Sequence, residues 1–304
     1  MNYKKIIKNR KTRFKILRKL NWVPDSIMVR IQYRIKMGFW PNLKHPKRFT
    51  EKAQLYKINY KNPVMPQCVD KYDVREFVQN KGLGNILNHC YGVYESVDDI
   101  HWNDLPKQFV MKLTTGGGGL NVVIVKDKDK EDIEHLKQIV RSWRTAPRKK
   151  QPSLGREWAY TGIKNSRVII EDLMEDNTNA DGSIDDYKFM CFDGKFRFLW
   201  VDKNRYTNHK RGFWDEQLNF LENVSSDYPA LDSQPQLPAN IYEMIKVAEK
   251  LSEDFPHARV DLYNIRGKII FGEITFYFNS GYVRFKPDSF DYDLGKYFDV
   301  SSFC

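Results

Sequence analysis

Three ionisable residues late in the chain have the types and spacing of a metal site. Arg259 and Asp261 lie in the apolar stretch RVDLY, and Glu273 lies in KIIFGEITF. A turn signal at residues 264–267 separates the two stretches, which predicts a β-hairpin with Asp261 opposite Glu273, their Cβ atoms about 5 Å apart. Like charges so placed destabilise a hairpin unless a cation lies between them, and two carboxylates beside phosphate groups suit Mg²⁺. The alternative is that one acid pairs with Arg259 and the other points to solvent.

Side chains in a strand alternate between its two faces, so the hairpin also predicts which residues lie together. Arg259, Asp261 and Tyr263 are expected on one face of the first strand. The same alternation places Phe271, Glu273 and Thr275 on one face of the second strand.

Four consecutive glycines between two β-rich stretches form a second candidate site. They are Gly116, Gly117, Gly118 and Gly119, within FVMKLTTGGGGLNVVIVK. Bare backbone N–H groups can surround an anion there, and phosphate can approach closely. No Gly-Lys-Ser/Thr follows, and the next element is a strand, which excludes a Walker A loop and a dinucleotide fingerprint. We interpret the loop as a phosphate cover with Lys112 on the adjoining strand; a plain hairpin tip would not require four glycines.

Periodicity and breaker residues predict the elements that position these groups. Helices are expected over residues 3–22, 50–60, 66–81, 126–144 and 239–255, with Thr50 as an N-cap and Lys71 in the first half of the third helix. Strands are expected over residues 90–94 and 166–174, and a hairpin over 186–201 turns at Asp193 and Gly194. Loops are expected over residues 148–155, 175–185, 204–214 and 221–238.

The composition is that of a globular α+β protein. The chain has 304 residues, of which 41% are hydrophobic and 29% charged. It contains no run of 18 apolar residues, and we expect neither a membrane span nor a signal peptide. Four cysteines show no paired spacing, so we expect reduced thiols in a cytoplasmic protein and no zinc site or disulfide framework.

The formal net charge of +11 is concentrated at the N-terminus. Residues 1–20 contain nine Lys or Arg and no acid, which leaves only +2 for the remainder. This distribution argues against a globular domain with a basic surface that binds nucleic acid. A basic amphipathic arm of this kind is expected to contact an anionic membrane surface or an acidic partner, and the alternative is a solvated helix that packs on its own domain.

Taken in order, these motifs resemble ATP-grasp enzymes over residues 70–281. The resemblance implies an ATP-grasp fold in which the nucleotide lies between two sheet-bearing subdomains. Lys71 and Lys112 would hold its phosphates under the glycine loop, and the backbone of Glu171, Asp172 and Leu173 would contact adenine. Arg259, Asp261 and Glu273 match the Arg-x-Asp and Glu-x-Asn pair of D-alanine–D-alanine ligase-like members. The segment with Asp186 and Lys188 resembles the Asp-x-Arg segment of glutamate-adding ligases. This resemblance implies that Asp186 is one of the ATP-binding residues.

The stretches DKYDVREFV, DYKFMCFDGKF, RVDLY and GEITFYFNSG are more narrowly similar to the teichuronopeptide-biosynthesis (TupA-like) branch, associated with bacterial capsule and exopolysaccharide genes. Thr275 stands where many relatives place a metal-binding Asn, so Thr275, Asn279 or water would complete the metal site. The expected domains are a basic arm with a short helical region at 1–65 and an ATP-grasp domain at 66–304. Within it, a lid subdomain would cover about 106–172 and a C-terminal subdomain about 173–304.

The resemblance implies an ATP- and Mg²⁺-dependent carboxylate–amine ligase, with Mn²⁺ as the alternative metal. It would join an amino acid or amine to a uronic-acid-containing glycan or lipid-linked glycan through an acyl-phosphate, in the cytoplasm or peripherally at the inner face of the membrane. Arg259 and Lys188 would stabilise developing charge. Arg205, His209 and Arg211 would hold an acidic acceptor, unless they form an ordinary basic surface.

Three other functions compete with the ligase. A phosphotransferase would use the same ATP cleft to phosphorylate a sugar hydroxyl. A glycosyltransferase is disfavoured because two phosphate-facing lysines under a glycine cover indicate a triphosphate. A binding protein that only senses nucleotide would not need two metal carboxylates.

Overall fold

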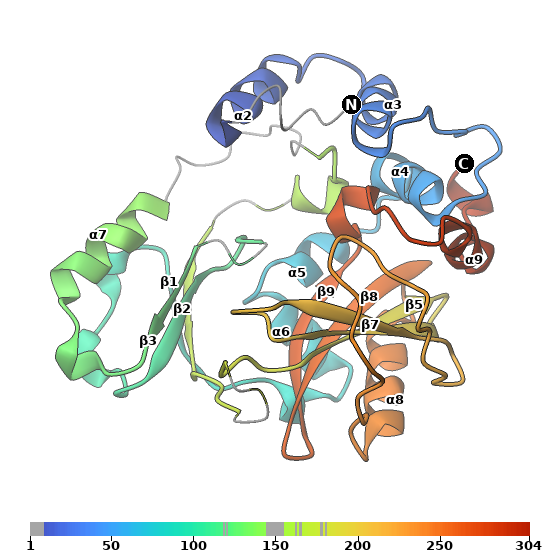
Figure 1. Cartoon of the computed structure of the whole chain (residues 1–304). Helices are drawn as coiled ribbons and strands as arrows, with labels where there is room; N and C mark the ends of the chain where they lie inside the picture. Colours follow the sequence, from blue (N-terminus) through green and yellow to red (C-terminus); the bar gives the residue numbers. More distant parts are fainter. Residues whose placement is uncertain are drawn as a thin grey trace.

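The computed structural model describes residues 9–117, 119, 121–143, 155–161, 163, 166–176, 179 and 181–304. These residues form two antiparallel sheets that lie side by side, with helices around them (Figure 1). Residues 1–8 of the expected arm, Gly118 and most of the expected loop at 148–155 lie outside the described residues. No helix within the described parts of the chain is long and apolar enough to cross a bilayer.

The first sheet has four strands in the order β1-β4-β2-β3. Their bounds are β1 Cys90–Tyr94, β2 Phe109–Leu113, β3 Val122–Val125 and β4 Val168–Glu171. One face packs on α7 (Ile133–Trp143) to form a separate hydrophobic core, in which Leu136 and Val140 meet Met111 and Ile170. This unit therefore has its own core, distinct from that of the second sheet. The expected bounds of the lid subdomain, about 106 and 172, stay a prediction. Strand β1 belongs to the same four-stranded sheet but ends before residue 106.

The second sheet has five strands in the order β7-β6-β5-β8-β9. Their bounds are β5 Asp186–Phe192, β6 Lys195–Lys203, β7 Lys210–Trp214, β8 His257–Ile265 and β9 Lys268–Thr275. The predicted turn at Asp193 and Gly194 joins β5 to β6, and both residues have positive φ values of 48° and 70°, as a tight hairpin turn requires. Helix α8 (Ile241–Ser252) covers one face and contacts β5, β6 and β8.

Helices from both ends of the chain lie beside the sheets (Figure 1). They are α2 Arg10–Lys19, α3 Asp25–Met37, α4 Phe49–Asn59, α5 Met65–Val69, α6 Val74–Asn80 and α9 Ser289–Tyr297. α9 packs tightly on the start of α4: a Cβ added at Gly295 would lie 2.1 Å from the Lys47 carbonyl oxygen. Phe49 of α4, with Phe298 just beyond α9, closes one end of the five-stranded sheet against His257.

Three predicted elements differ from the structure. The helix expected at 66–81 is broken into α5 and α6, because the Asp70 carboxylate accepts the backbone N–H groups of Tyr72 (2.9 Å) and Asp73 (3.1 Å). Lys71 therefore lies in a turn and not on a helix. The expected loop at 204–214 contains β7, which pairs with β6. The helix expected at 126–144 begins only at Ile133.

The other two differences concern single positions. Helix α4 begins at Phe49, and Thr50 is no N-cap: its hydroxyl donates to the buried Asp291 carboxylate (2.7 Å). In β9 a bulge opposite Asp261 and Leu262 turns Phe271 to the apolar face, where it pairs with Leu262. Phe271 and Glu273 therefore lie on opposite faces, contrary to the simple alternation.

The buried His257 predicts how stability depends on pH. Burial lowers the pKa of His257 from 6.5 to about 3. The unfolded chain therefore takes up a proton that the folded chain does not, so this residue's contribution to stability is complete above pH 6.5 and is lost as pH falls towards 3. Replacing His257 by Phe should flatten the decline in unfolding free energy between pH 6 and 4 by up to about 1.4 kcal/mol per pH unit.

Urea unfolding at a series of pH values measures this slope. The control is His135→Asn, which removes an exposed histidine of α7 and should keep the wild-type slope. A His257→Phe slope equal to that of the wild type would contradict the prediction.

Candidate active site

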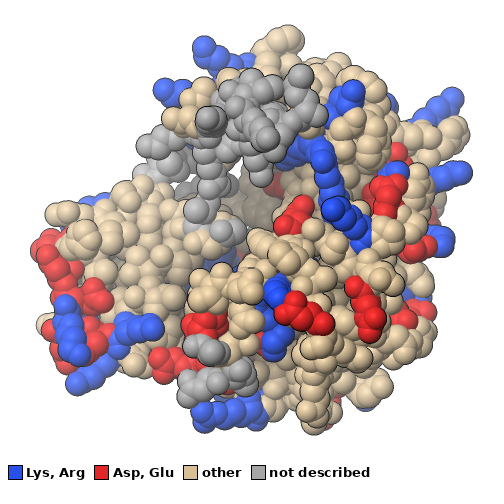
Figure 2. Space-filling model, viewed as in Figure 1, with Lys and Arg blue, Asp and Glu red and all other residues tan. Residues whose placement is uncertain are grey.

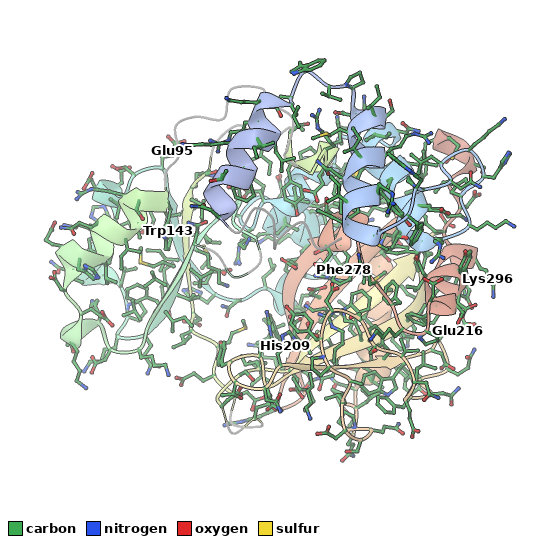
Figure 3. The ribbon with its side chains drawn as sticks, turned by 45° about the horizontal axis from the view of Figure 1, so that its top comes forward. Glu95, Trp143, His209, Glu216, Phe278 and Lys296 are labelled. Atoms are coloured by element: carbon green, nitrogen blue, oxygen red, sulfur yellow. The ribbon has the colours of Figure 1, made fainter. Side chains whose placement is uncertain are left out.

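A pocket of about 230 Å³ lies where the two sheets and the α5–α6 connection meet. It is lined by residues of the α5–α6 connection, the glycine loop, β9 and the short 3-10 helix Phe278–Gly281. Lys71, Gly116, Arg259 and Glu273 all face it. In Figure 3, Phe278 lies beside the five-stranded sheet, whereas Trp143 lies at the far side of the four-stranded sheet. The pocket thus brings together several predicted site residues that are far apart in the sequence.

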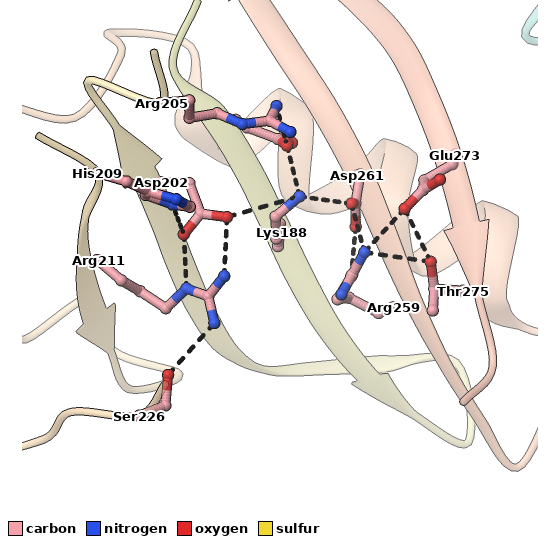
Figure 4. A network of polar contacts seen from close by, with 11 residues as sticks. Lys188, Asp202, Arg205, His209, Arg211, Ser226, Arg259, Asp261, Glu273 and Thr275 are labelled. Carbon is pink, nitrogen blue, oxygen red and sulfur yellow. Dashed lines mark hydrogen bonds and ion pairs between the residues drawn. The ribbon is translucent and has the colours of Figure 1, made fainter. Parts of the chain in front are cut away.

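The β8–β9 register is the one predicted from the sequence: Asp261 pairs with Glu273. Arg259 bridges the two acids, donating to Asp261 Oδ1 (2.6 Å), Asp261 Oδ2 (2.6 Å) and Glu273 Oε1 (2.9 Å) (Figure 4). Its guanidinium also donates to Thr275 Oγ1 (3.1 Å). The cation between the two carboxylates is therefore Arg259 itself, and the alternative of an acid facing solvent alone is wrong.

The donor set around Glu273 fits Mg²⁺. Its side chain is 48% exposed, next to the Thr275 hydroxyl (3.1 Å) and across from Asp261. Burial alone would raise the pKa of Glu273, but Arg259, Lys188 and Lys71 together lower it, so the carboxylate is ionised. Among the described residues no group of three or more His, Cys, Asp or Glu could hold a metal, but Mg²⁺ needs only one or two carboxylates with phosphate oxygens.

Lys188 of β5 lies at the centre of a network of buried ions (Figure 4). Its ammonium donates to Asp186 (2.5 Å) and Asp261 (2.6 Å) and lies 3.9 Å from Asp202. The partly exposed Arg205 also donates to Asp186, through Nη1 to Oδ2 (2.7 Å). The sequence assigned Asp186 to ATP and Lys188 to catalysis; the structure brings them into direct contact, and both are buried.

Arg211 lies in this network and is not part of a basic surface. It is buried and donates to Asp202 through Nε (2.5 Å) and Nη2 (2.9 Å). His209 Nε2 lies 3.2 Å from the same carboxylate, and its ring lies against Tyr228, 3.8 Å between centroids. Burial would raise the pKa of Asp202, but His209 and Arg211 hold it well below its usual range. The alternative of an ordinary basic surface is therefore wrong for Arg211.

Lys71 links the α5–α6 turn to the glycine loop. Its backbone N–H donates to the Thr114 carbonyl (3.0 Å), and its ammonium donates to the Gly116 carbonyl. Burial lowers the pKa of Lys71, opposed by the nearby Glu273 carboxylate. Of the glycine loop, Gly116 and Gly117 line the pocket and Gly119 is exposed, while Gly118 lies outside the described residues.

Lys112 and Glu171 face each other from adjacent strands of the first sheet. Lys112 Nζ lies 2.9 Å from Glu171 Oε2, and Arg75 holds the other carboxylate oxygen (3.2 Å). The backbone of Asp172 is already engaged, since its N–H donates to the His89 carbonyl (3.0 Å) and its carbonyl accepts from Asn88 (2.9 Å). Among the three expected adenine contacts, Asp172 thus has its backbone N–H already engaged, while its carbonyl can accept one further hydrogen bond.

Asn279 reaches the pocket on a strained turn. Asn279, Ser280 and Gly281 all have positive φ values of 43°, 59° and 71°. The buried Lys57 of α4 donates to the Ser280 carbonyl (2.9 Å), and Gln54 donates to the Gly281 carbonyl (2.8 Å). A Cβ at Gly281 would lie 2.5 Å from the Gln54 side chain, so only glycine fits there. Helix α4 therefore fixes the turn that carries Asn279, whose amide donates to Asp227 (2.5 Å).

The sequence analysis missed three residues of this site. Asp202 could have been noticed as a single acid in the apolar strand FRFLWVD, like Asp261 in RVDLY. Lys57, which holds the Ser280 carbonyl, and Tyr160, which lines the pocket, gave no such signal, because a lysine in a helix and an isolated tyrosine are ordinary surface or core residues. Their roles follow from packing alone.

The comparisons with known proteins agree with the family that the order of the motifs indicated. The family model described as TupA-like ATPgrasp matches residues 51–299. The chain belongs to the TupA-like ATP-grasp family. Its fold is accordingly the α+β ATP-grasp fold, as the resemblance implied. No curated protein shows significant sequence similarity to the chain.

Solved structures of similar fold include three ligases. D-alanine–D-alanine ligase from Bacillus anthracis is 19% identical, with 69% of this chain and 57% of that one covered and a TM-score of 0.43. L-amino acid ligase from Bacillus licheniformis is 17% identical, with 73% and 46% covered and a TM-score of 0.43. D-alanine–D-alanine ligase from Helicobacter pylori is 15% identical, with 83% and 70% covered and a TM-score of 0.44. The chain spans 57% and 46% of the length of the two Bacillus ligases, and the family assignment rests on the family-model match.

The bridging role of Arg259 predicts a large loss of stability when its charge is removed. In Arg259→Met, Asp261 and Glu273 would face each other without their shared cation, which should cost about 3–5 kcal/mol of unfolding free energy. Adding Asp261→Asn should recover much of this loss, since it removes one of the two like charges. Chemical unfolding of the single and double variants measures both effects.

Lys268→Met is the matched control, because Lys268 is an exposed cation at the start of the neighbouring strand β9 and should change stability by less than about 0.5 kcal/mol. An Arg259→Met protein as stable as the wild type would show that the two acids do not depend on this cation.

Proposed function

We propose that the protein is an ATP- and Mg²⁺-dependent carboxylate–amine ligase. One observation carries the proposal: Lys71, the glycine loop, Arg259 and Glu273 converge on one pocket of a TupA-like ATP-grasp chain. A triphosphate needs cations from several directions, and this pocket offers Lys71 from one side and Arg259 from the other. Lys112 would contact the phosphates after its ion pair with Glu171 is broken.

Glu273, Asp261 and Thr275 are the residues that would hold Mg²⁺, with Asn279 as a further oxygen donor on the pocket rim. When bound, Mg²⁺ would offset phosphate charge beside the two carboxylates. To bind the metal, Asp261 would have to give up its hydrogen bonds from Arg259 or from Lys188, since both of its carboxylate oxygens now accept from those cations. That exchange would leave a cation available to a second anion in the same pocket.

The acceptor chemistry favours a carboxylate. In the proposed reaction a substrate carboxylate oxygen attacks the γ-phosphorus and releases ADP, and an amine then displaces inorganic phosphate from the acyl-phosphate. Arg259 and Lys188 would bind the negative oxygens that form in these steps. The acids around them already accept from cations, so they are poor general bases for a neutral hydroxyl. This argues against the phosphotransferase alternative.

We further propose a uronic-acid-containing glycan or lipid-linked glycan as the carboxylate substrate and an amino acid or amine as the second substrate. Arg205 and His209 at the open side of the network would contact this acceptor, while Arg211 would position Asp202. The proposed setting is bacterial capsule or exopolysaccharide synthesis, in the cytoplasm or at the inner face of the membrane, with residues 1–20 contacting anionic lipid.

The metal assignment predicts that nucleotide binding depends on the two carboxylates. Mg-ATP at a hundredfold excess over its dissociation constant should stabilise the wild-type fold by about 2.7 kcal/mol, because ligand binds only the folded chain. Asp261→Asn with Glu273→Gln should abolish the difference between ATP with Mg²⁺ and ATP with EDTA. Thermal unfolding under both conditions measures it.

Asp232→Asn is the control for the loss of an acid, since Asp232 forms an exposed ion pair with Lys210 at the surface. It should keep the full Mg²⁺ effect. If the double variant keeps that effect too, the metal lies elsewhere.

Product analysis separates the ligase from the phosphotransferase. Incubation with ATP, a uronic-acid glycan, mixed amino acids and hydroxylamine should yield a hydroxamate or an amide together with ADP and free phosphate. Hydroxylamine traps acyl-phosphates, and mass spectrometry of the glycan identifies the product. A glycan that gains a phosphoryl group while no free phosphate appears would establish the phosphotransferase instead.

A further inference from the structure

The outer face of α3 carries a stripe of exposed isoleucines. Ile27, Ile31 and Ile35 recur at intervals of four residues, which places them on one side of the helix, and they are 49%, 40% and 42% exposed. The opposite side of α3 is buried, with Met28 and Tyr33 packed on the body of the protein. The stripe therefore leaves much of its apolar surface open to solvent, on the side of α3 away from the core.

Exposed tryptophans flank this stripe. Trp22 precedes α3 and is 80% exposed, and Trp40 follows it and is 62% exposed. Tryptophan is enriched at the boundary between hydrocarbon and water, since its ring is apolar and its N–H is polar. Arg30 and Arg34 are exposed beside the isoleucines on the same helix. Apolar and cationic side chains thus alternate over one face.

The charge of the segment that includes α2 and α3 is strongly positive. Residues 1–50 contain 15 Lys or Arg and a single acid, Asp25, whereas residues 51–304 contain 35 Lys or Arg and 38 Asp or Glu. The formal charge is therefore +14 for the first segment and −3 for the rest. Asp25 is engaged by Arg156 (2.6 Å). Figure 2 shows Lys and Arg side chains among uncharged residues along the upper margin, where α2 and α3 lie.

Hydrogen bonds connect α3 to the elements that carry the pocket. Tyr33 is hydrogen-bonded to Thr50 of α4 (2.8 Å), and Tyr282, directly after the Asn279–Gly281 turn, donates to Gln32 of α3 (3.0 Å). The buried Arg156 also donates to the Leu20 carbonyl (2.8 Å) and so holds the chain between α2 and α3. A surface bound by this face would therefore hold the pocket in one orientation.

We propose that the outer face of α3, with Trp22 and Trp40, binds the surface of an anionic lipid bilayer. The isoleucines and tryptophans enter the headgroup region, and the surrounding Lys and Arg side chains contact lipid phosphates. A protein partner is disfavoured because a strongly cationic segment with exposed apolar residues between its cations suits a fluid anionic surface. The proposal does not rest on the chemistry of the pocket, and its test contains no nucleotide.

The test is co-sedimentation of the full chain with vesicles of phosphatidylglycerol or of phosphatidylcholine. The wild type should bind phosphatidylglycerol vesicles at about 0.15 M salt and bind phosphatidylcholine at least about tenfold more weakly. Ile27→Gln/Ile31→Gln/Ile35→Gln should weaken the binding to phosphatidylglycerol by about tenfold or more at unchanged charge. The change in tryptophan emission on vesicle binding should be smaller in Trp22→Phe than in the wild type.

Val122→Gln/Ile124→Gln/Tyr242→Gln is the matched control, since these three apolar residues are also exposed but lie on β3 and α8. It should bind vesicles as the wild type does, and both triple variants should unfold at the wild-type temperature. The proposal is overturned if the α3 variant binds as tightly as the wild type, which would indicate attraction by charge alone. It is equally overturned if the wild type binds no vesicles, which would leave the face to a protein partner.

Discussion

The site depends on a balance of buried charge on one face of the five-stranded sheet. The register of the sheet places like charges opposite each other twice, Asp186 against Asp202 and Asp261 against Glu273. Four cationic side chains, Lys188, Arg205, Arg211 and Arg259, lie between these four acids. Each ion is expensive to remove from water, so the face is stable only while every partner is present. The strand register thus brings the like charges together, and the four cations in turn stabilise that register.

This balance also explains how a polar site can lie inside a packed protein. The opposite face of the same sheet is apolar, and Leu262 and Phe271 there pack in the main core with α8. On the charged face, Trp200 and Phe278 lie against the guanidinium groups of Arg211 and Arg259. Aromatic rings hold a guanidinium in place without competing for its hydrogen bonds. The cations are therefore held in position before any anionic ligand arrives.

The pocket lies between the glycine loop of the four-stranded sheet and the charged face of the five-stranded sheet. The four-stranded sheet has its own core with α7, and its glycine loop touches the rest of the site through Lys71 and Gly116. Lys57 and Gln54 of α4 fix the turn after β9 on the other side. Three separate parts of the chain thus set the size of the cavity, and a shift of any of them would change which groups face a bound nucleotide.

The sequence alone determined what local periodicity and composition control. Alternation in RVDLY and GEITF, with a turn between them, was enough to place Asp261 opposite Glu273, and four glycines were enough to indicate the loop near Lys71. Tertiary structure decided the rest. A β-bulge at Gly272, where a Cβ would lie 2.9 Å from the Asp261 carbonyl, turned Phe271 into the core, and pairing with β6 made a strand of an expected loop and buried Arg211. Such outcomes depend on neighbours distant in sequence, because burial and pairing of a charge are properties of the packed chain and not of its local pattern.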